Sequence, residues 1–409
     1  MTVELRVLES EQWDEWFSTL ERAFGSAVWP TEEREFDRGV TELSRSIAAW
    51  DGAEVVGTAG AFSFRMAVPG GAVVPAAGVT MVSVASTHRR RGLLSSMMRR
   101  QLDEVHELGE PLAVLTASEP AIYGRFGYEV ATRQTSLEVD TLRAGLTVPA
   151  GADGVTLRFA DPEEALAACE EVYGRLVPTR PGMLERRPNW ERKGVLDPEA
   201  FRDGASKLLC VVAERDGEVR GYTRYAVKSA WNPAGPDGTV VLRDLEALDP
   251  DTYAALWRYL FGIDLTCRIT ARNRPADDPV LHVVDDVRRC GVRVREGLLL
   301  RPVEVGAALS ARTYAAPLDV VLEVSDPFCP WNEGRWRLGG DAKGATCERT
   351  TDAADLALSV RELGAAYLGD VSLTALARAG RVRELRQGAL REAAVAFGGD
   401  VAPWLPHGF

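Results

Sequence analysis

Cysteine, histidine and long apolar runs are scarce in this sequence, and each scarcity excludes a class of protein. The 6 cysteines among 409 residues stand apart, with no CxxC pair and no histidine at ligand spacing, so we expect neither a metal site nor a disulfide framework. No apolar run approaches the roughly 18 to 20 residues of a membrane span, so no membrane partner is expected. The acidic N-terminal stretch MTVELRVLESEQWDEW lacks the layout of a signal peptide. Together these patterns predict a cytoplasmic protein.

Positive charge is also in deficit. The chain has 48 Lys and Arg residues against 60 Asp and Glu residues, which gives a net charge of −12 at pH 7. An acidic surface repels nucleic acid and anionic membranes and favours cationic partners. Apolar and charged fractions of 46% and 26% are typical of a folded, soluble protein. We therefore expect a cationic partner and no nucleic acid.

Two common nucleotide-binding signatures are missing, since the chain has neither the GxxxxGK[ST] of a P-loop nor the GxGxxG of a dinucleotide fold. What it has instead is the stretch VSVASTHRRRGLLSSMMRRQL, residues 82–102. A β-branched run leads into three arginines and Gly92, after which apolar residues recur at helical spacing. The stretch therefore predicts a strand, a basic turn and a helix.

The basic turn is a candidate anion site. A helix N-terminus presents unpaired N–H groups and the positive end of the helix dipole. Gly92 would let the backbone approach a bulky anion, and arginines donate charge-assisted hydrogen bonds to phosphate. The alternative is an exposed basic helix start without a ligand, which a bare RRxG would favour. The strand before the turn, and a second recognisable element about thirty residues further on, favour the anion site.

The length of the chain requires two or three domains. Residues 1–145 alternate between helical and strand patterns, and the Gly-, Ala- and Pro-rich stretch 142–155 predicts a boundary. Residues 146–300 repeat a strand-turn-strand pattern of the first part without its basic turn, which predicts a duplicated but catalytically silent copy. Residues 301–409 combine strand and helical patterns without a catalytic cluster, so we expect a small α+β domain there.

Two motifs in the first part carry a resemblance to a known family. Arg89-Arg90-Arg91-Gly92-Leu93-Leu94 resembles the pyrophosphate-binding loop of the GCN5-related N-acetyltransferases (GNAT). The segment IYGRFGY, residues 122–128, resembles the aromatic segment of that fold. With its three parts and its aromatic ending WLPHGF, the whole chain resembles the Eis (enhanced intracellular survival) family, in which a residue such as Leu94 is usual at the end of the loop.

The resemblance implies an α/β fold of mixed α+β character, in which tandem GNAT-like acetyltransferase domains precede a sterol-carrier-like C-terminal domain. It implies an enzyme that moves an acetyl group from acetyl-CoA to amines of a cationic small molecule. Aminoglycosides acetylated at more than one position are the expected substrates, which would make the protein an antibiotic-resistance enzyme. The resemblance also implies a homohexamer.

The same resemblance implies how acetyl-CoA is bound. A strand would hold the pantetheine arm through its backbone, the basic turn would cradle the pyrophosphate, and the end of the next strand would close the other side. The implied cofactor-binding residues are Val82, Ser83, Val84, Arg89, Arg90, Arg91, Gly92, Leu93, Leu94, Ser95, Ser118 and Glu119.

Two catalytic residues are implied. Tyr123 is the candidate general acid, because a phenol with a pKa of about 10 can donate a proton to a thiolate whose acid has a pKa of about 8.5. Tyr128 competes for this role, but its place just inside the next strand pattern indicates packing. No histidine is well placed as the base, so the resemblance assigns it to the C-terminal carboxylate of Phe409, which would act through a water molecule. The apolar ending predicts a docked tail.

The acceptor pocket is also implied by position. Its expected substrate-binding residues are Phe24, Ser26, Trp29, Phe36 and Met81. Family members that act on aminoglycosides carry acidic residues where this chain has Ser26 and Gly408, so polycationic antibiotics would bind more weakly or in a different place. A lysine or polyamine acetyltransferase would share the mechanism and differ in the acceptor. The non-catalytic alternative is a protein that binds an apolar ligand in its C-terminal domain and responds to acetyl-CoA.

Overall fold

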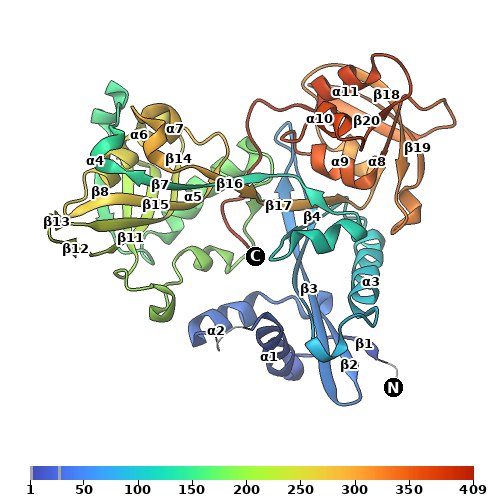
Figure 1. Ribbon diagram of the computed structural model, residues 1–409, viewed down its shortest axis with the longest axis horizontal. Coiled ribbons are helices and arrows are strands. Elements are labelled where there is room, and N and C mark those ends of the chain that lie inside the picture. The colour runs from blue at the N-terminus through green and yellow to red at the C-terminus, as the bar shows by residue number, and fades with distance from the viewer. Residues whose placement is uncertain (1–2, 26–28) are drawn as a thin grey trace.

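The computed structural model describes residues 3–25 and 29–409, which form two large sheets and a smaller one (Figure 1). All neighbours in the first sheet are antiparallel except β4 and β5. Its strands, in spatial order, are β1 (Glu4–Val7), β2 (Ile47–Asp51), β3 (Glu54–Ala67), β4 (Val73–Val84), β5 (Leu112–Thr116), β17 (Leu298–Pro302) and β6 (Glu129–Val130), with β9 (Leu184–Glu185) paired to β3.

Three helices accompany the first sheet, namely α1 (Trp13–Phe24), α2 (Thr31–Val40) and α3 (Leu93–Glu107). α1 forms because Trp13, Trp16, Phe17 and Leu20 recur at helical spacing and bury one face of the helix. It ends at Gly25, whose φ of 65° is the left-handed conformation that favours glycine.

The second sheet has seven strands and lies beside the first (Figure 1). In spatial order they are β16 (Arg293–Glu296), β7 (Arg133–Asp140), β15 (Thr266–Pro275), β14 (Gly238–Ala247), β11 (Glu218–Lys228), β10 (Leu209–Arg215) and β8 (Thr156–Ala160). The helices here are α4 (Thr141–Ala144), α5 (Leu166–Leu176), α6 (Pro250–Phe261) and α7 (Val280–Val283), and a short ribbon joins β12 (Trp231–Asn232) to β13 (Gly235–Pro236).

The two large sheets exchange strands. β7 follows β6 in sequence but pairs with β15 and β16 of the second sheet. In return β17, which follows β16, lies between β5 and β6 of the first sheet. The divisions expected after residues 145 and 300 therefore do not separate the sheets, because β7 lies before the first division and β17 spans the second.

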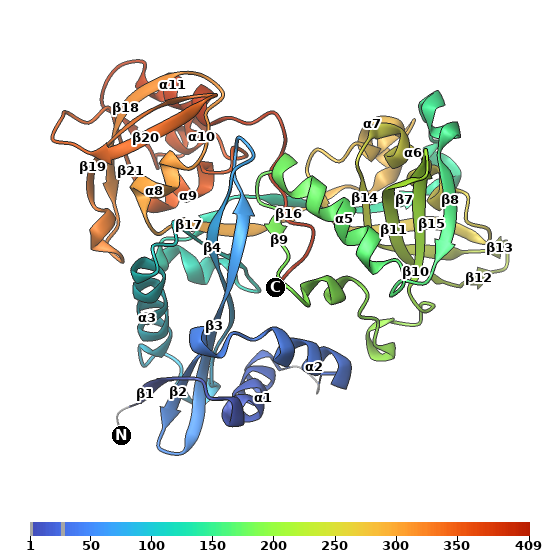
Figure 2. The same ribbon diagram turned by 180° about the vertical axis from the view of Figure 1, so that it is seen from behind.

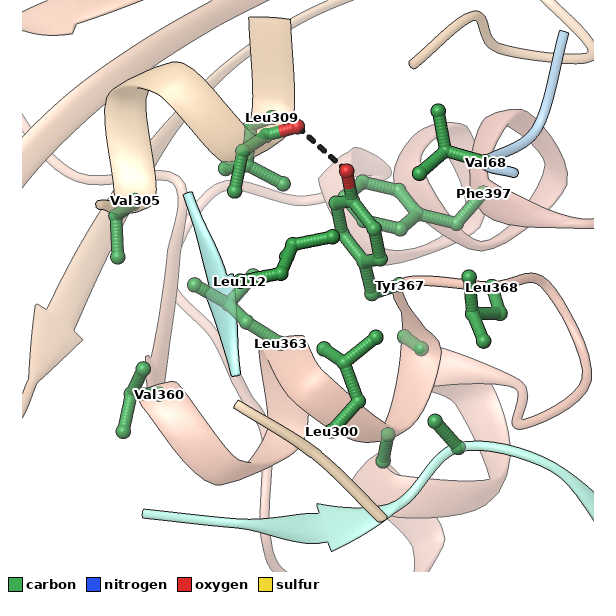
Figure 3. Packing of buried hydrophobic residues seen from close by; sticks show 14 of the residues in the cluster. Val68, Leu112, Leu300, Val305, Leu309, Val360, Leu363, Tyr367, Leu368 and Phe397 are labelled. Carbon is green, nitrogen blue, oxygen red and sulfur yellow. Dashed lines mark hydrogen bonds between the residues drawn. The ribbon is translucent and has the colours of Figure 1, made fainter. Parts of the chain in front are cut away.

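The third unit is a five-stranded sheet with short helices. The strands, in spatial order, are β20 (Gly344–Arg349), β19 (Gly334–Asp341), β18 (Leu318–Ser325), β21 (Leu356–Ser359) and β22 (Arg383–Glu384), and the helices are α8 (Val305–Ser310), α9 (Val360–Ala366), α10 (Leu373–Arg378) and α11 (Ala389–Phe397). Its core is continuous with that of the first sheet. Leu112 and Leu300 of that sheet belong to the same buried cluster as Leu363, Leu368 and Phe397 (Figure 3). The third unit is thus packed firmly against the first.

After α11 the chain leaves the third unit and runs back between the two large sheets, where it ends beside β9 (Figure 2). Trp404 and Leu405 in this segment are buried. None of the helices in the described ranges has both the length and the apolar character that a membrane crossing requires.

Candidate active site

A wedge opens between β4 and β5. The two parallel strands pair only from Ala76 to Gly78 on β4 and from Leu112 to Val114 on β5, and beyond these residues they run on without pairing to each other in the described chain. A β-bulge lies at this point, because the β3–β4 register shifts after Thr58 and Met81 has a φ of 52°. Bulges bend a strand away from its neighbour. The edge of β4 beyond the bulge is therefore open to an extended ligand.

The backbone of β4 alternates between β3 and the wedge. The N–H of Ala85 donates to the carbonyl of Val56 on β3, at 2.9 Å. Because backbone groups of successive strand residues point to opposite edges, those of Ser83 also face β3 and those of Val82 and Val84 face the wedge. Ser83 is further tied to β3, since its hydroxyl lies 2.7 Å from that of Thr58. Of the three strand residues expected to contact the cofactor, Ser83 thus supports β4 rather than lining the wedge.

The basic turn lies at the end of β4 and leads directly into α3. Arg90 and Gly92 have φ values of 64° and 83°, which directs the turn into the helix at Leu93. A side chain built at Gly92 would meet no protein atom within 4 Å. Residues 89–92 and Ser95 in the first helical turn are exposed, whereas the side chain of Leu93 is buried and that of Leu94 is half-buried. The backbone at Gly92 is thus accessible to a bulky group.

The three arginines of the turn are exposed and have no ion-pair partner among the described residues. Arg89, Arg90 and Arg91 form no ion pair with any residue in the ranges 3–25 and 29–409, although His88 pairs with Asp51 and Arg100 with Glu104 close by. In a chain with more acidic than basic residues, these three adjacent cations keep all their donors free for an anion.

The other side of the wedge carries Tyr123. After β5, Ser118 and Glu119 are exposed, and a 3-10 helix from Pro120 to Phe126 follows. Tyr123 is half-buried in this helix. Burial, reinforced by the Glu119 carboxylate, raises the pKa of the Tyr123 phenol above its ordinary value. The phenol therefore keeps its proton at neutral pH and has one to donate.

Tyr128 lies behind Tyr123, with 6.1 Å between the ring centroids. It is fully buried, its hydroxyl has no hydrogen-bond partner among the described residues, and burial raises its pKa. A phenol enclosed in this way has no path to a reacting group. The geometry favours Tyr123 over Tyr128 as the proton donor.

A buried arginine supports the segment between the two tyrosines. The guanidinium of Arg301, on β17, donates to the carbonyl of Phe126 and pairs with Asp326 of the third unit. Gly127 lies against this guanidinium with a φ of 86°, and a Cβ there would collide with it. The exchanged strand and the third unit thus both hold the Tyr123 segment in place.

The chain end reaches the point where β4 and β5 separate. A Cβ built on Gly78, the last paired residue of β4, would lie 3.2 Å from the Phe409 ring. That ring packs edge-on against Phe64, with 5.1 Å between centroids. A Cβ on Gly408 would lie 3.9 Å from the hydroxyl of Thr116, the last residue of β5. The tail therefore brings its terminal residue to the apex of the wedge.

The residues expected to bind the acceptor amine do not all lie together in one pocket. Phe36 is buried against Trp190, with 5.8 Å between ring centroids, and Trp190 also contacts Phe62 and Phe64. Met81 is half-buried at the bulge and Trp29 is half-buried at the foot of α2. Phe24 is 53% exposed at the end of α1, and the expected residue Ser26 lies outside the described residues.

Phe36, Phe62, Phe64 and Trp190 form an aromatic wall. Ionisable groups that the sequence analysis did not identify lie beside this wall. Asp37, next to Phe36, is buried with one carboxylate oxygen that has no partner among the described residues, and burial raises its pKa to about 7. The Lys193 amine lies 5.4 Å from the Trp190 ring centroid, and burial lowers its pKa. Asp37 and Lys193 are far apart in sequence, so no local pattern could have connected them.

His407 is another residue that the sequence did not reveal. Its Nε2 lies 3.2 Å from the Tyr173 hydroxyl, and its ring stacks on Trp190. Burial, together with the nearby charges of Arg186 and Lys193, lowers the pKa of His407 well below its ordinary value, so the ring is neutral at pH 7. It lies two residues before the chain end and forms part of the wall around Phe409.

Comparisons with known proteins agree with this architecture. Residues 4–131 and 182–302 each match a model described as an acetyltransferase (GNAT) domain, and residues 305–406 match a sterol carrier protein domain. The predicted tandem GNAT fold with a sterol-carrier-like third domain is thereby confirmed.

Relatives match the chain along its length. The sequence is 66% identical to an N-acetyltransferase of Streptomyces avermitilis, with 100% of both chains covered. It is 34% identical to the N-acetyltransferase Eis of Mycobacterium bovis, with 98% of each covered. The crystal structure of Eis1 from Mycobacterium abscessus matches at 32% identity with a TM-score of 0.84, covering 100% of both chains. A GCN5-related N-acetyltransferase from Anabaena variabilis shares the fold at 20% identity, with a TM-score of 0.85.

Proposed function

The chain belongs to the Eis family of GCN5-related N-acetyltransferases, and we propose that it acetylates amines of a cationic small molecule, with aminoglycosides, modified at more than one position, as the first candidates. The chain is an acyl-CoA-dependent N-acetyltransferase, which the two GNAT domains and the named relatives establish. The observation that carries the proposal is the position of Phe409 at the apex of the wedge whose two strands lead to the basic turn and to the Tyr123 helix.

The wedge fits acetyl-CoA. The open edge of β4 offers the backbone groups of Val82 and Val84 to the pantetheine arm. The unpaired arginines 89–91 and the first N–H groups of α3, from Gly92 to Ser95, would hold the pyrophosphate. Ser118 and Glu119 are exposed at the end of β5 and would close the other side. When bound, acetyl-CoA supplies an activated acetyl group as a thioester.

Tyr123 supplies the proton in this proposal. Its phenol stays protonated at neutral pH because burial and Glu119 raise its pKa. Such a group can donate to the departing thiolate, whose acid has a pKa of about 8.5. The support from Arg301 beneath Phe126 fixes the helix that carries the phenol.

The α-carboxylate of Phe409 removes the proton of the acceptor amine in this proposal. A carboxylate with a pKa of about 3.5 is a weak base, so it would act through a water molecule. The aromatic rings around Phe409 hold the chain end and limit the access of bulk water. A base fixed in this position is oriented before the amine arrives.

The aromatic wall supports a cationic acceptor. Phe36 and Trp190 are buried and already hold the Lys193 ammonium, at 5.7 Å and 5.4 Å from their ring centroids, so the wall accommodates positive charge. The carboxyls of Glu33 and Asp37 lie on the adjoining helix α2. Burial raises the pKa of both carboxyls, so an approaching ammonium would stabilise their charged forms. The wall would serve equally for an aminoglycoside or a polyamine, and a lysine peptide would share the chemistry. Assembly as a homohexamer and a cytoplasmic location stay predictions from the sequence.

A thiol-release screen tests the proposal. The purified protein is given acetyl-CoA with aminoglycosides, polyamines or lysine peptides, and free thiol is measured. We expect release with aminoglycosides and a mono- or poly-acetylated product by mass spectrometry, and Tyr123→Phe serves as the control for enzyme-independent release. Release with lysine peptides alone would contradict a small-molecule acceptor. Tight binding of acetyl-CoA with no release from any amine would favour the apolar-ligand-binding alternative.

A further inference from the structure

The second sheet contains a wedge in the same place as the first. β14 and β15 are parallel and pair as far as Leu242 and Ala271. A bulge lies at this point, because the register between β11 and β14 shifts after Arg224. Beyond these residues β14 and β15 continue without pairing to each other in the described chain. The second sheet therefore has the same kind of opening as the one proposed to bind acetyl-CoA in the first sheet.

The protein fills this second wedge with its own side chains. The guanidinium of Arg274, on β15, donates to the carbonyl of Leu245 on β14 at 3.1 Å and to the carboxylate of Asp278 at 2.6 Å. Arg274 is only 5% exposed. The backbone edge that would hold an extended ligand is thus occupied. The next helix, α6, begins with Asp249 and Asp251 instead of arginines, and these carboxylates repel phosphate.

The C-terminal tail covers the filled wedge. The Trp404 ring centroid lies 5.4 Å from the Arg274 guanidinium. The indole N–H of Trp404 donates to the carbonyl of Asn273, at 3.0 Å. In return the side-chain amide of Asn273 donates to the carbonyl of Leu405, also at 3.0 Å. Asn273 therefore binds the tail through both its backbone and its side chain.

Asn273 has an uncommon backbone conformation that suits this task. Its φ of 54° is left-handed, which few residues other than glycine and asparagine adopt at low cost. Asn273 stands in a β-bulge, where the β15–β7 register shifts between Ala271 and Arg274, and its two hydrogen bonds to the tail start from this bulge. Upstream, the N–H of Ala402 donates to the carboxylate of Asp277 at 2.9 Å. The tail is thus fixed at several successive points of the second wedge.

The tail contacts both wedges close to the point where the parallel strands separate. Asn273 stands two residues beyond the last residue of β15 that pairs with β14, in a bulge where the β15–β7 register shifts, and Thr116 stands two residues beyond the last residue of β5 that pairs with β4. Leu405 is bonded to Asn273, and Gly408 lies beside Thr116. Between them Pro406 restricts the backbone. A displacement at Asn273 is therefore transmitted to Phe409 over only four residues.

We propose that the second wedge is a docking site for the C-terminal tail, and that Asn273 is a positioning residue that sets where Phe409 ends in the first wedge. The docking stands on the contacts of Asn273 and Trp404, and the effect on catalysis rests on the proposed role of the Phe409 carboxylate. Fixing that carboxylate matters because displacement of a catalytic group by about 1 Å can cost about 10²-fold in rate.

Release of Phe409 by a carboxypeptidase measures docking without reference to activity. Asn273→Gly removes the amide donor and keeps the left-handed backbone at no strain. Asn273→Asp retains the shape but presents an acceptor to the Leu405 carbonyl. We expect both variants to lose Phe409 about 10-fold faster by mass spectrometry, since one net hydrogen bond is worth that factor. Asp216→Gly is the matched control, because Asp216 is also left-handed, with φ 54°, in a turn remote from the tail.

Kinetics then test the positioning role. We expect Asn273→Gly to lower kcat about 10-fold, with the affinity for acetyl-CoA unchanged in calorimetry, and Asp216→Gly to change neither. Unchanged release of Phe409 in both Asn273 variants would overturn the docking proposal. Faster release with unchanged kcat would overturn the positioning role. A Phe409 deletion measured alongside separates the two ideas: full turnover without Phe409 would refute the proposed base, whereas the release assay would still report on docking.

Discussion

Each of the two acetyltransferase-like sheets contains a wedge between two parallel strands, and the two wedges differ in what occupies them. In the first, β4 and β5 separate beyond Gly78 and Val114, and the Phe409 ring lies at the apex. In the second, the guanidinium of Arg274 on β15 bridges to the carbonyl of Leu245 on β14. The first wedge is followed by three unpaired arginines and the second by a helix that begins with carboxylates.

This difference shows that a few side chains decide the use of an opening that the backbone provides twice. Both wedges arise from a parallel pair of strands that separates at a bulge. The presence of a GNAT fold alone therefore does not indicate a coenzyme site, because function depends on the residues of the site. The second domain contacts the tail instead, and in our proposal it holds the tail in place for the first domain.

Deletion of Phe409 is expected to have the largest effect, because Phe409 lies in the first wedge and not in the second. Deleting Phe409 is expected to lower turnover about 10³-fold, the contribution typical of an acid–base group with its orientation. The affinity for acetyl-CoA, measured by calorimetry, should stay unchanged, since the basic turn is untouched. A protein that keeps full activity with a C-terminal tag would remove Phe409 from the mechanism.

Removal of the Tyr123 hydroxyl, on the other side of the first wedge, is expected to have the second-largest effect. Tyr123→Phe is expected to lower kcat about 10²-fold with little change in either KM, which is the signature of a group that acts in the transition state. Tyr128→Phe is the matched control, because Tyr128 is buried behind Tyr123 and its hydroxyl has no partner among the described residues. A loss in Tyr128→Phe with none in Tyr123→Phe would transfer the role to Tyr128.

Each of the two acetyltransferase-like domains also contains a buried carboxyl group. The pH dependence of the unfolding free energy reports on both groups. Burial raises the pKa of Asp37 from 3.8 to about 7 and that of Glu246, on β14, from 4.5 to about 7. Between about pH 4 and pH 7 the folded state therefore holds a proton that the unfolded state has released, so the free energy of unfolding falls as pH rises through this window. Above the folded pKa this contribution is lost.

Substitution isolates each contribution. Asp37→Asn is expected to remove about 2 kcal/mol of the fall in unfolding free energy between about pH 5.5 and pH 8, as measured by urea denaturation. Glu246→Gln should have a similar effect on stability. Only Asp37→Asn should also raise the KM for the amine, because Asp37 adjoins Phe36 in the acceptor wall. An equal change of KM in both variants would contradict the assignment of the wall.

A substitution in the basic turn is expected to have a smaller effect, limited to the affinity for acetyl-CoA. Gly92→Val is expected to weaken acetyl-CoA binding about 10-fold, because it adds a side chain where the backbone must approach the pyrophosphate. Gly217→Val is the matched control, since Gly217 has a φ of 82° and an equally open surrounding in the second domain. The strain of a left-handed valine is thus common to both. Equal affinities in calorimetry would refute the turn as the pyrophosphate site.

The last prediction is for no effect. Titration should give one acetyl-CoA per chain, because Arg274 occupies the backbone edge of the second wedge. The Gly92→Val variant should retain the same single site at lower affinity. A second binding event in either protein would break the contrast between the wedges.

Local sequence signals were enough to predict the strand, turn and helix that carry the proposed coenzyme site. The change from a β-branched run to helical spacing across Gly92 predicted the strand, the turn and α3, because these patterns depend only on neighbouring residues. The strand pattern that begins at Tyr128 is in fact two strands, β6 and β7, which join different sheets. Nothing in their own residues indicates that β17, far along the chain, separates β6 from β5.

The missed residues share a cause. Lys193, His407 and Asn273 each act through a contact with a segment far away in sequence, and their own surroundings contain no periodic or spaced pattern. Asn273 stands in ITARNRPADD, which looks like an ordinary polar strand end. Its left-handed backbone and its bonds to the tail become visible only in three dimensions.

The exchange of β7 and β17 has a consequence for how the protein is made. During translation β5 and β6 emerge early, but the strand that belongs between them ends only at Pro302. The nascent catalytic sheet therefore has unpaired strand edges between β5 and β6 until most of the chain has left the ribosome. Such unpaired edges are prone to mispairing. A fragment cut after β6 should aggregate instead of folding, and refolding of the whole chain should be slow because its decisive strand pairs are distant in sequence. The two domains thus fold as one obligate unit.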